Sequence, residues 1–445
     1  MAHIIHDFMR YNPNMQGNLA QRLQTVLPRE EWALLQRVAQ AAGKLRLPLY
    51  AVGGLPRDAI LGNPGKDFDL VVEGPAEGLA HSLARQYGGR VVVHRAFGTA
   101  KWEVPGPKPR RTAALGPGGA IEALDFITAR SESYRHPGAL PTVAPGTIAD
   151  DLRRRDFTIN AIAIRLDGTH LGEVRDDLGG RKDVEDGVVR VLHAQSFIDD
   201  PTRTYRAVRY EQRYGFRIAK ETLELLPGGR AGVKGLSAQR IRHELDLILD
   251  EARAQAMLER LAELDLLAPI HPSLSYDDEA ARRLVAADQA PPMPVPAMPR
   301  RGLRWLLWLM GLPVVEITSI NGRLHFTAGL LRALVAASQL LMEIDSMAEL
   351  QPSGWDKRLG GVPPAATYAV YLALSSGTAR SALGRYLGEW RHLRLTTTGR
   401  DLERLGIKPG VEYKRILQEL RRAWLDGDIR SPEDEQAYLH RMLNR

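Results

Sequence analysis

Two glycines followed by two alternating carboxylates form the pattern with the clearest chemistry in this chain. Gly53 and Gly54 end a short apolar segment, and Asp67 and Asp69 follow within twenty residues. Glycine lets backbone amides approach a ligand, and the start of the next helix attracts phosphate. Residues two apart in a strand point to the same side, so we expect the two aspartates to share a face. Carboxylates beside a phosphate site are typical ligands of Mg²⁺ with a nucleoside triphosphate, and the pattern indicates nucleotidyl transfer.

A third carboxylate, Asp125, interrupts the apolar segment 123–127. A strand here that pairs with residues 68–72 would bring Asp125 to Asp67 and Asp69. Three such carboxylates can hold two Mg²⁺ ions, one for the attacking hydroxyl and one for the leaving pyrophosphate. The alternative for Asp125 is a solvent-facing aspartate at a strand edge. The alternative for the two glycines and the two earlier aspartates is a tight turn beside a solvated acidic pair.

Arginines accompany polar side chains at two places near these acids. Arg57 falls in the first turn after the glycines, where its planar guanidinium suits triphosphate oxygens. The segment 151–161 can grip phosphates and sugar hydroxyls, and its candidate ligands are Arg154, Arg155, Asp156 and Asn160. A salt-bridged helix start is the alternative for this segment.

A further set, Asp200, Arg203 and Arg206, has a spacing of three residues, which predicts one face of a helix. An acidic acceptor beside an arginine donor forms a hydrogen-bonding edge that can read a nucleobase. The alternative is an ion pair within the helix, worth about 0.2–0.5 kcal/mol.

A mixed sheet is needed to position these residues. Apolar patterns predict strands at 49–52, 68–72, 90–94, 100–104 and 121–128. Helical patterns at 30–44, 57–61 and 75–87 alternate with them, which is typical of an α/β module. Beyond about residue 183 only helical patterns remain, at 243–268, 303–310, 328–344, 364–375 and 380–392. Proline-rich and glycine-rich composition predicts a loop at 105–119 and a linker at 291–299.

Composition narrows the class of protein. The 445 residues include no cysteine, which excludes disulfides, thiolate catalysis and cysteine-ligated zinc. The net charge of +7 favours a polyanionic partner, although arginine-rich composition alone is an alternative explanation. No apolar run approaches the roughly 18 residues that span a bilayer, so we expect a cytoplasmic protein without a membrane segment.

Together these motifs resemble those of the class II tRNA nucleotidyltransferase family, which includes CCA-, CC- and A-adding enzymes and bacterial poly(A) polymerases. The matching segments, in the family's order, are 52–58, 67–69, 130–134, 154–161, 177–180 and 199–203, and 236–245 is similar to the family's neck helix. The resemblance implies an α+β, polymerase-β-like head with a mixed sheet and helices, followed by all-α neck, body and tail domains. The implied divisions are an N-terminal extension at 1–29, a head at 30–182, a neck for nucleobase selection at 183–275, a body at 276–380 and an RNA-binding tail at 381–445.

The resemblance also implies roles for the site residues. It places Mg²⁺ at Asp67 and Asp69, and the triphosphate at Gly53, Gly54 and Arg57. Asp200 and Arg203 would bond the base of CTP or ATP, so that protein side chains replace a nucleic-acid template. This chain departs from the family pattern at Asp199, where many members carry glutamate, and at Pro56, where valine is usual. The shorter side chain leaves an orienting role for Asp199 in question.

The tail resembles the family more weakly. Segments 399–402 and 405–410 precede a helical pattern at 412–425, and the Gly-x-x-Pro-Gly sequence exposes amides that can bind RNA phosphate. The candidate RNA ligands are Lys408, Arg415, Arg421 and Arg422, with a solvated charged face as the alternative.

The sequence therefore predicts an enzyme that adds C and/or A residues to the 3′ end of tRNA and releases pyrophosphate. A template-independent poly(A) polymerase is the nearest alternative. A catalytically silent RNA-binding paralogue is another, disfavoured because metal ligands are intact. A small-molecule nucleotidyltransferase is disfavoured by the long basic helical half. Partial CC or A addition would depend on a mobile element, for which 130–146 is the candidate.

Overall fold

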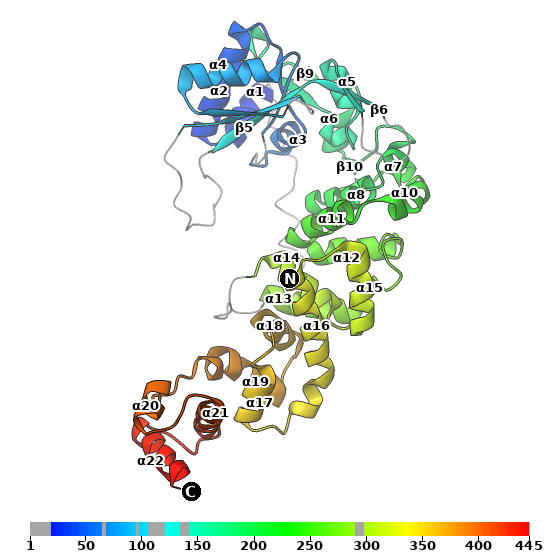
Figure 1. The fold of residues 1–445 in the computed structure, drawn as a ribbon. Helices are drawn as coiled ribbons and strands as arrows, with labels where there is room; N and C mark the ends of the chain where they lie inside the picture. The colour runs from blue at the N-terminus through cyan, green and yellow to red at the C-terminus, as the bar shows by residue number, and fades with distance from the viewer. Residues whose placement is uncertain are drawn as a thin grey trace. The chain divides into compact units, whose positions relative to one another are not determined.

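A computed structural model describes residues 19–64, 68–94, 98–105, 121–133, 142–289 and 298–444. The chain divides into two compact units, residues 1–236 and 237–445 (Figure 1). The first unit contains the predicted mixed sheet, and the described part of the second is helical. Asp67, most of the predicted loop at 105–119 and most of the predicted linker at 291–299 lie outside the described residues.

The main sheet of the first unit has seven strands in the order β3-β4-β5-β2-β1-β8-β9. Strand β2 pairs antiparallel with β1 and parallel with β5, so it lies in the middle of the sheet. Its apolar residues and those of β1 are buried, as expected for a central strand covered on both faces. The strands are β1 (Leu49–Val52), β2 (Asp69–Val72), β3 (Arg90–His94), β4 (Thr99–Glu103), β5 (Ala123–Thr128), β8 (Ala163–Arg165) and β9 (Val174–Arg175).

Helices cover this sheet with apolar faces at helical spacing. Helix α4 (Ala76–Tyr87) packs against β3, β4 and β5 through a stripe that includes Leu79 and Leu83. Helix α2 (Arg29–Lys44) packs against α4, and α3 (Gly54–Leu61) packs against β1 and α1 (Leu19–Val26). Helix α1 therefore gives regular structure to part of the segment predicted as an N-terminal extension. Helix α5 (Ile148–Arg153) begins with a capping box between Thr147 and Asp150.

The rest of the first unit is built from short elements. They are the hairpin β6 (Arg130–Ser133) and β7 (Thr142–Pro145), η2 (Thr158–Asn160), η3 (Gly168–His170), α6 (Gly180–Glu185), β10 (Val188–Val189), α7 (Ser196–Asp199), α8 (Arg203–Tyr214), β11 (Arg217–Ile218), α9 (Lys220–Leu223), α10 (Leu226–Gly232) and η4 (Val233–Gly235). Strands β10 and β11 pair in parallel, which corrects the prediction that strands end near residue 183. Two residues are too few to produce a periodic pattern in a sequence.

The described part of the second unit consists of helices joined by short loops. They are α11 (Ala238–Asp250), α12 (Ala254–Glu263), α13 (Asp278–Gln289), α14 (Arg300–Leu309), α15 (Val314–Leu324), α16 (Ala328–Glu343), η5 (Ile344–Met347), α17 (Pro352–Leu359), α18 (Pro364–Ala373), α19 (Thr378–Gly388), η6 (Trp390–His392), α20 (Gly399–Arg404), α21 (Val411–Asp426) and α22 (Pro432–Leu443). None of the described helices combines the length and the apolar character that crossing a membrane requires.

The predicted helix at 243–268 is wrong in one respect, because α11 and α12 are separate helices. The buried Arg304 on α14 donates to the carbonyls of Leu249 and Glu251, at 2.7 and 2.5 Å. These bonds satisfy carbonyls at the end of α11 that would otherwise accept from N–H groups of the next helical turn. A partner some 55 residues away in sequence therefore stabilises the break.

Candidate active site

Two carboxylates lie side by side in the middle of the sheet. In the parallel pair β2–β5, Asp69 is directly opposite Asp125. Cross-strand partners project from the same face, so both acids are presented together. On its other side, Asp125 is 3.3 Å from Nζ of Lys101, and it remains 49% exposed. The predicted pairing of these two strands is confirmed, whereas Asp67 lies outside the described residues.

The glycine turn meets this pair of acids directly. Gly53 follows β1 as the N-cap of α3 and has φ +70°, a conformation that favours glycine. A Cβ atom added at Gly53 would lie 2.9 Å from Oδ2 of Asp69 and 3.0 Å from Nη1 of Arg155. A side chain at this position would therefore displace both groups. The turn, an acid and a guanidinium converge on one point, as a phosphate and metal site requires.

The buried Asp151 holds the two arginines of the polar segment. Its Oδ2 accepts from Nη2 of Arg155 at 2.9 Å, and its Oδ1 accepts from Nη2 of Arg154 at 2.6 Å. Asp151 is fully buried, so it keeps these two partners in fixed orientations. Asp151 is a site residue that was not predicted from the sequence. Its spacing of three and four residues from the arginines on a helical turn is the signal that would have found it.

Arg57 lies in a different environment from the one predicted. It is 4% exposed, donates from Nε and Nη2 to Oδ1 of Asp58 at 3.1 Å, and donates from Nη1 to Asn160. Its guanidinium carbon is 4.4 Å from the ring centre of Tyr214 and 5.5 Å from that of Tyr210. Burial alone would lower the pKa of Arg57, but Asp58 and the two tyrosines raise it, so the charge is retained. This environment argues against the predicted triphosphate contact, because protein groups already occupy the guanidinium.

A chain of hydrogen bonds joins Asn160 to helix α8. The Asn160 amide donates to Oδ1 of Asp156 at 2.9 Å, and Arg206 donates to Oδ2 of Asp156 at 2.8 and 2.5 Å. Burial alone would raise the pKa of Asp156, but Arg206 and Asn160 outweigh it and lower the pKa to about 2. The predicted nucleotide ligands Asp156, Asn160 and Arg206 therefore form a buried link between η2 and α8.

This lowered pKa predicts an acid-sensitive contribution to stability. A carboxyl group whose folded pKa lies near 2, against an ordinary 3.8, stabilises the fold above pH 4 and loses that contribution as pH falls towards 2. The shift corresponds to about 2 kcal/mol. We expect Asp156→Asn to lower the free energy of unfolding by about this amount at pH 7 and to shrink the difference from the parent chain at pH 3. Urea unfolding at both pH values measures this. An equal difference at pH 7 and pH 3 would contradict the assignment.

Asp200 and Arg203 depart from the predicted single helical face. Helix α8 begins at Arg203, and Asp200 has extended backbone before it, with φ −139° and ψ 95°. Oδ1 of Asp200 accepts from the backbone N–H and the hydroxyl of Thr202, at 3.0 and 2.7 Å. The prediction was wrong because this carboxylate stabilises the turn before the helix instead of joining its surface.

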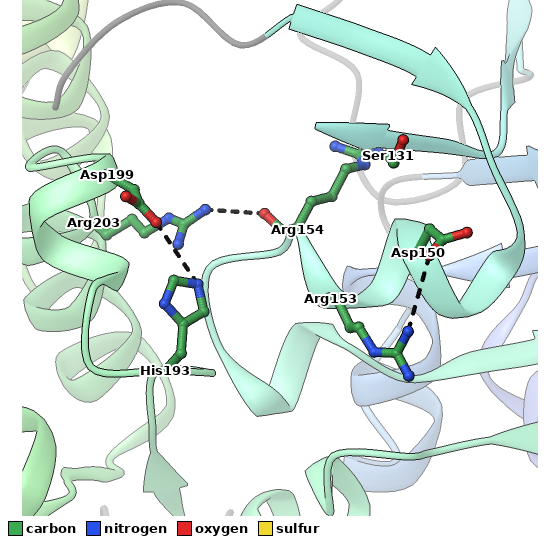
Figure 2. Close-up of a pocket in the computed structure, with 7 residues that line it drawn as sticks. All are labelled: Ser131, Asp150, Arg153, Arg154, His193, Asp199 and Arg203. Atoms are coloured by element: carbon green, nitrogen blue, oxygen red, sulfur yellow. Dashed lines mark hydrogen bonds and ion pairs between the residues drawn. The ribbon is translucent and has the colours of Figure 1, made fainter. Parts of the chain in front are cut away.

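A cavity of about 260 Å³ opens beside these residues (Figure 2). It is lined by Ser131, Asp150, Arg153, Arg154, His193, Asp199 and Arg203. Arg203 is 6% exposed and donates from Nη2 to the carbonyl of Arg154 at 2.9 Å. Its Nη1 is buried and has no hydrogen-bond partner within the described residues. A buried donor that faces a polar cavity without a partner is a candidate ligand contact.

Comparison with known proteins agrees with this geometry. Residues 49–190 match a family model described as the poly(A) polymerase head domain, and residues 215–277 match one described as a probable RNA- and SrmB-binding site of polymerase A. The A-adding tRNA nucleotidyltransferase of Halalkalibacterium halodurans is 32% identical over 437 residues, which cover 96% of each chain. The chain belongs to the tRNA nucleotidyltransferase and poly(A) polymerase family.

Other members of this family match over most of the chain. The CC-adding tRNA nucleotidyltransferase of Deinococcus radiodurans is 30% identical over 397 residues, which cover 89% of each chain. The structure of the Thermotoga maritima CCA-adding enzyme complexed with tRNA has a TM-score of 0.75 at 27% identity, and covers 96% of this chain and 99% of that one. Structures of a CCA-adding enzyme with ATP and with CTP have the same TM-score. The predicted family and fold class are confirmed.

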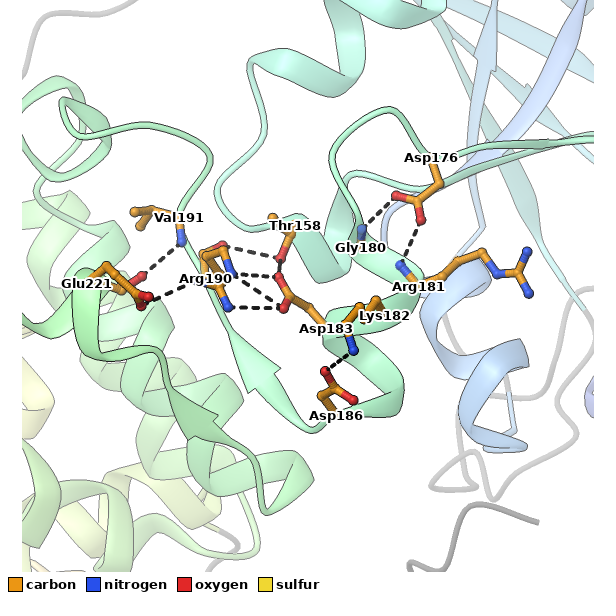
Figure 3. A network of polar contacts seen from close by, with 11 residues as sticks. Thr158, Asp176, Gly180, Arg181, Lys182, Asp183, Asp186, Arg190, Val191 and Glu221 are labelled. Atoms are coloured by element: carbon orange, nitrogen blue, oxygen red, sulfur yellow. Dashed lines mark hydrogen bonds and ion pairs between the residues drawn. The ribbon is translucent and has the colours of Figure 1, made fainter. Parts of the chain in front are cut away.

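A second network of polar contacts in the first unit stabilises η2 (Figure 3). The hydroxyl of Thr158 donates to the buried Asp183 at 2.7 Å, and Nε of Arg190 donates to the same carboxylate at 3.1 Å. Arg190 also donates to Glu221 on α9 at 3.3 Å. Gly180 packs so closely that an added Cβ would lie 2.1 Å from the carbonyl oxygen of Thr158. These contacts hold the 3₁₀ turn that carries Asn160 against α6 and β10.

The tail arginines differ from one another in their surroundings. Arg421 donates to both oxygens of Asp356 on α17 at 2.7 Å, and to the carbonyls of Trp390 and Leu393 at 2.8 Å. Four of its five N–H donors are thus used within the protein, which leaves one donor for the RNA contact that the sequence predicts. The three other candidates lie at the surface: Lys408 is exposed, Arg415 pairs with Glu412, and Arg422 pairs with Glu419 and Asp426.

We therefore expect Arg421→Met to destabilise the second unit by about 2 kcal/mol, because it leaves Asp356 and two carbonyls without their partner. Arg415→Met is the matched control on the same helix. Its pair with Glu412 is exposed to solvent and is expected to contribute little to stability. Thermal unfolding of the two variants measures the difference. Equal midpoints would contradict the structural role of Arg421.

Proposed function

We propose that this chain transfers C and/or A nucleotides from CTP or ATP to the 3′ end of tRNA. The observation that supports this proposal most directly is that Asp69 lies opposite Asp125, beside the turn at Gly53 and Arg155. Support comes from relatives named A-adding and CC-adding tRNA nucleotidyltransferases, and from similar structures with tRNA, ATP and CTP. A tRNA substrate also accords with the expected cytoplasmic location.

Mg²⁺ fits the donor set of this site. The carboxylates of Asp69 and Asp125 are hard oxygen ligands that share one face and reach solvent. Asp67, two residues earlier in the sequence, is a further proposed ligand. When bound, Mg²⁺ would supply charge stabilisation for the attacking hydroxyl and the leaving pyrophosphate, and the sequence predicts two such ions.

The protein's own residues position the substrates. The turn at Gly53 leaves room for phosphate oxygens to approach backbone amides, and Arg155, oriented by Asp151, places a positive charge beside them. Nη1 of Arg203 offers a buried donor to the base in the adjoining cavity. The 3′-hydroxyl of the RNA attacks the α-phosphate, a new P–O bond forms, and pyrophosphate leaves. Positioning and electrostatics supply most of the acceleration in such reactions.

The test is extension of tRNA transcripts that end at the discriminator base, at C and at CC, with CTP and ATP supplied separately. We expect one A to be added to the transcript ending in CC, which both A-adding and full CCA-adding activities would do. Addition of C to the two shorter transcripts distinguishes the full and CC-only activities from A-only addition, and addition of A to the transcript ending in CC separates the full activity from the CC-only one. Run-on adenylation would instead support a poly(A) polymerase. Tight tRNA binding without any incorporation would support a silent paralogue and overturn the proposal.

A further inference from the structure

One titratable side chain in the cavity of Figure 2, His193, has no part in the reaction described above. It lies in the segment between β10 and α7, and its backbone N–H donates to Oγ of the buried Ser196 at 3.4 Å. Its Nε2 is 3.9 Å from Oδ2 of Asp199. The ring is therefore anchored at its base and faces the carboxylate at the end of α7.

Asp199 lines the same cavity as Arg203, yet no ion pair joins these two described side chains. The carboxylate faces His193, while Arg203 donates from Nη2 to the carbonyl of Arg154. The other charges of the cavity are paired elsewhere, Arg153 with Asp150 at 3.9 Å and Arg154 with the buried Asp151 at 2.6 Å. Of the two lining carboxylates, Asp150 therefore pairs with an arginine, whereas Asp199 faces an imidazole.

The pKa of His193 is affected by the charges of both Asp199 and Arg203. Burial lowers the pKa of His193, Arg203 lowers it further, and Asp199 opposes them. An acid, an imidazole and a guanidinium therefore interact around one corner of the cavity. Nη1 of Arg203, which lines the same cavity as Asp199, is a buried donor without a partner among the described residues. An unsatisfied buried donor favours pairing with a carboxylate, so we expect Asp199 to turn to it when the imidazole is removed.

We infer that His193 is a positioning residue that engages Asp199 and thereby keeps Nη1 of Arg203 available to the base of the incoming nucleotide. The inference rests on the proposed function, because it assigns the cavity to that base. A guanidinium neutralised by Asp199 would lose the donor that a base acceptor needs. Loss of His193 should then weaken nucleotide binding, and removal of Asp199 in the same chain should restore it.

The experiment compares His193→Ala, His193→Gln and the double variant His193→Ala/Asp199→Ala. KM and kcat are measured for ATP with tRNA ending in CC, and ATP affinity is measured by calorimetric titration. We expect His193→Ala to raise KM and Kd about tenfold, the effect of one hydrogen bond, with kcat within about threefold. His193→Gln retains a donor for Asp199 and should stay within about threefold of the parent chain. The double variant should recover most of the lost affinity, which is a coupling that purely structural damage does not produce.

His170→Ala is the matched control, because His170 is also 44% exposed and also pairs with a carboxylate, Glu173. It should leave ATP affinity unchanged.

The inference is overturned if His193→Ala binds ATP as the parent does, or if the double variant is no better than the single one. His193→Gln with Asp199→Ala gives the same comparison if the alanine variant fails to fold. A parent chain that binds ATP but extends no tRNA refutes the proposed function, while the affinity ratios still decide the role of His193. A parent chain that binds neither ATP nor CTP overturns both.

Discussion

Replacing Asp69 by asparagine is expected to lower the rate of nucleotide incorporation by about a thousandfold or more, because the change removes a charged oxygen ligand where the metal charge is needed. Asp69 is exposed at the edge of β2, so the fold should be unaffected. Single-turnover incorporation of ATP into tRNA ending in CC measures the rate, and a filter-binding titration measures tRNA affinity. The rate should collapse while tRNA affinity stays within about twofold of the parent value.

Glu77→Gln is the control for this variant. Glu77 is a partly exposed carboxylate on α4 in the same unit, and its recorded ion pair is with His81 on that helix. Its removal makes the same change of charge and should leave incorporation unchanged. If Asp69→Asn retained activity, the proposed metal site would be wrong, whatever the assignment of Asp125.

Replacing Arg57 by alanine is expected to destabilise the first unit by about 3–5 kcal/mol, the range for removing one partner of a buried charged pair. The change removes the charged donor of Asp58, which keeps the Tyr214 hydroxyl at 3.5 Å, and it removes the Arg57 donor of the buried Asn160. It also removes the cation that packs on Tyr214. Thermal unfolding of the full chain, with hydrogen exchange of α3 and β1 to assign the transition, measures the loss. The exchange measurement is needed because a chain of two units need not unfold in one step.

Arg37→Ala provides the comparison for Arg57. Arg37 is an exposed arginine on α2 that also lies over a tyrosine, 5.7 Å from the ring centre of Tyr87. Its loss should cost less than about 1 kcal/mol. The two accounts of Arg57 differ in outcome. A triphosphate contact would make the alanine variant normally stable but weak in ATP binding, whereas the structural role makes it unstable first.

The local features of this protein were predictable from sequence. Strand β3 at 90–94, the helix that follows Gly53 and the loop-and-helix alternation of the head each follow from residue chemistry within a few neighbours. The pairing of the Asp69 and Asp125 strands was also predictable, since two carboxylates in apolar strands require a shared polar site. The family could also be predicted from the sequence, because the motifs that carry the resemblance are short and contiguous.

Only the tertiary structure determined which residues of those motifs contact one another. Only the fold shows that Arg57 is enclosed by two tyrosines from α8, and that Arg155 lies at the turn of Gly53 instead. Spacing along the chain gave no sign that Arg304 would end α11 or that Arg421 would be bound by Asp356. The physical reason is the distance along the chain over which each interaction acts. Backbone preference and side-chain period act over a few residues, whereas a guanidinium takes the acceptors and rings that packing brings to it from far along the chain.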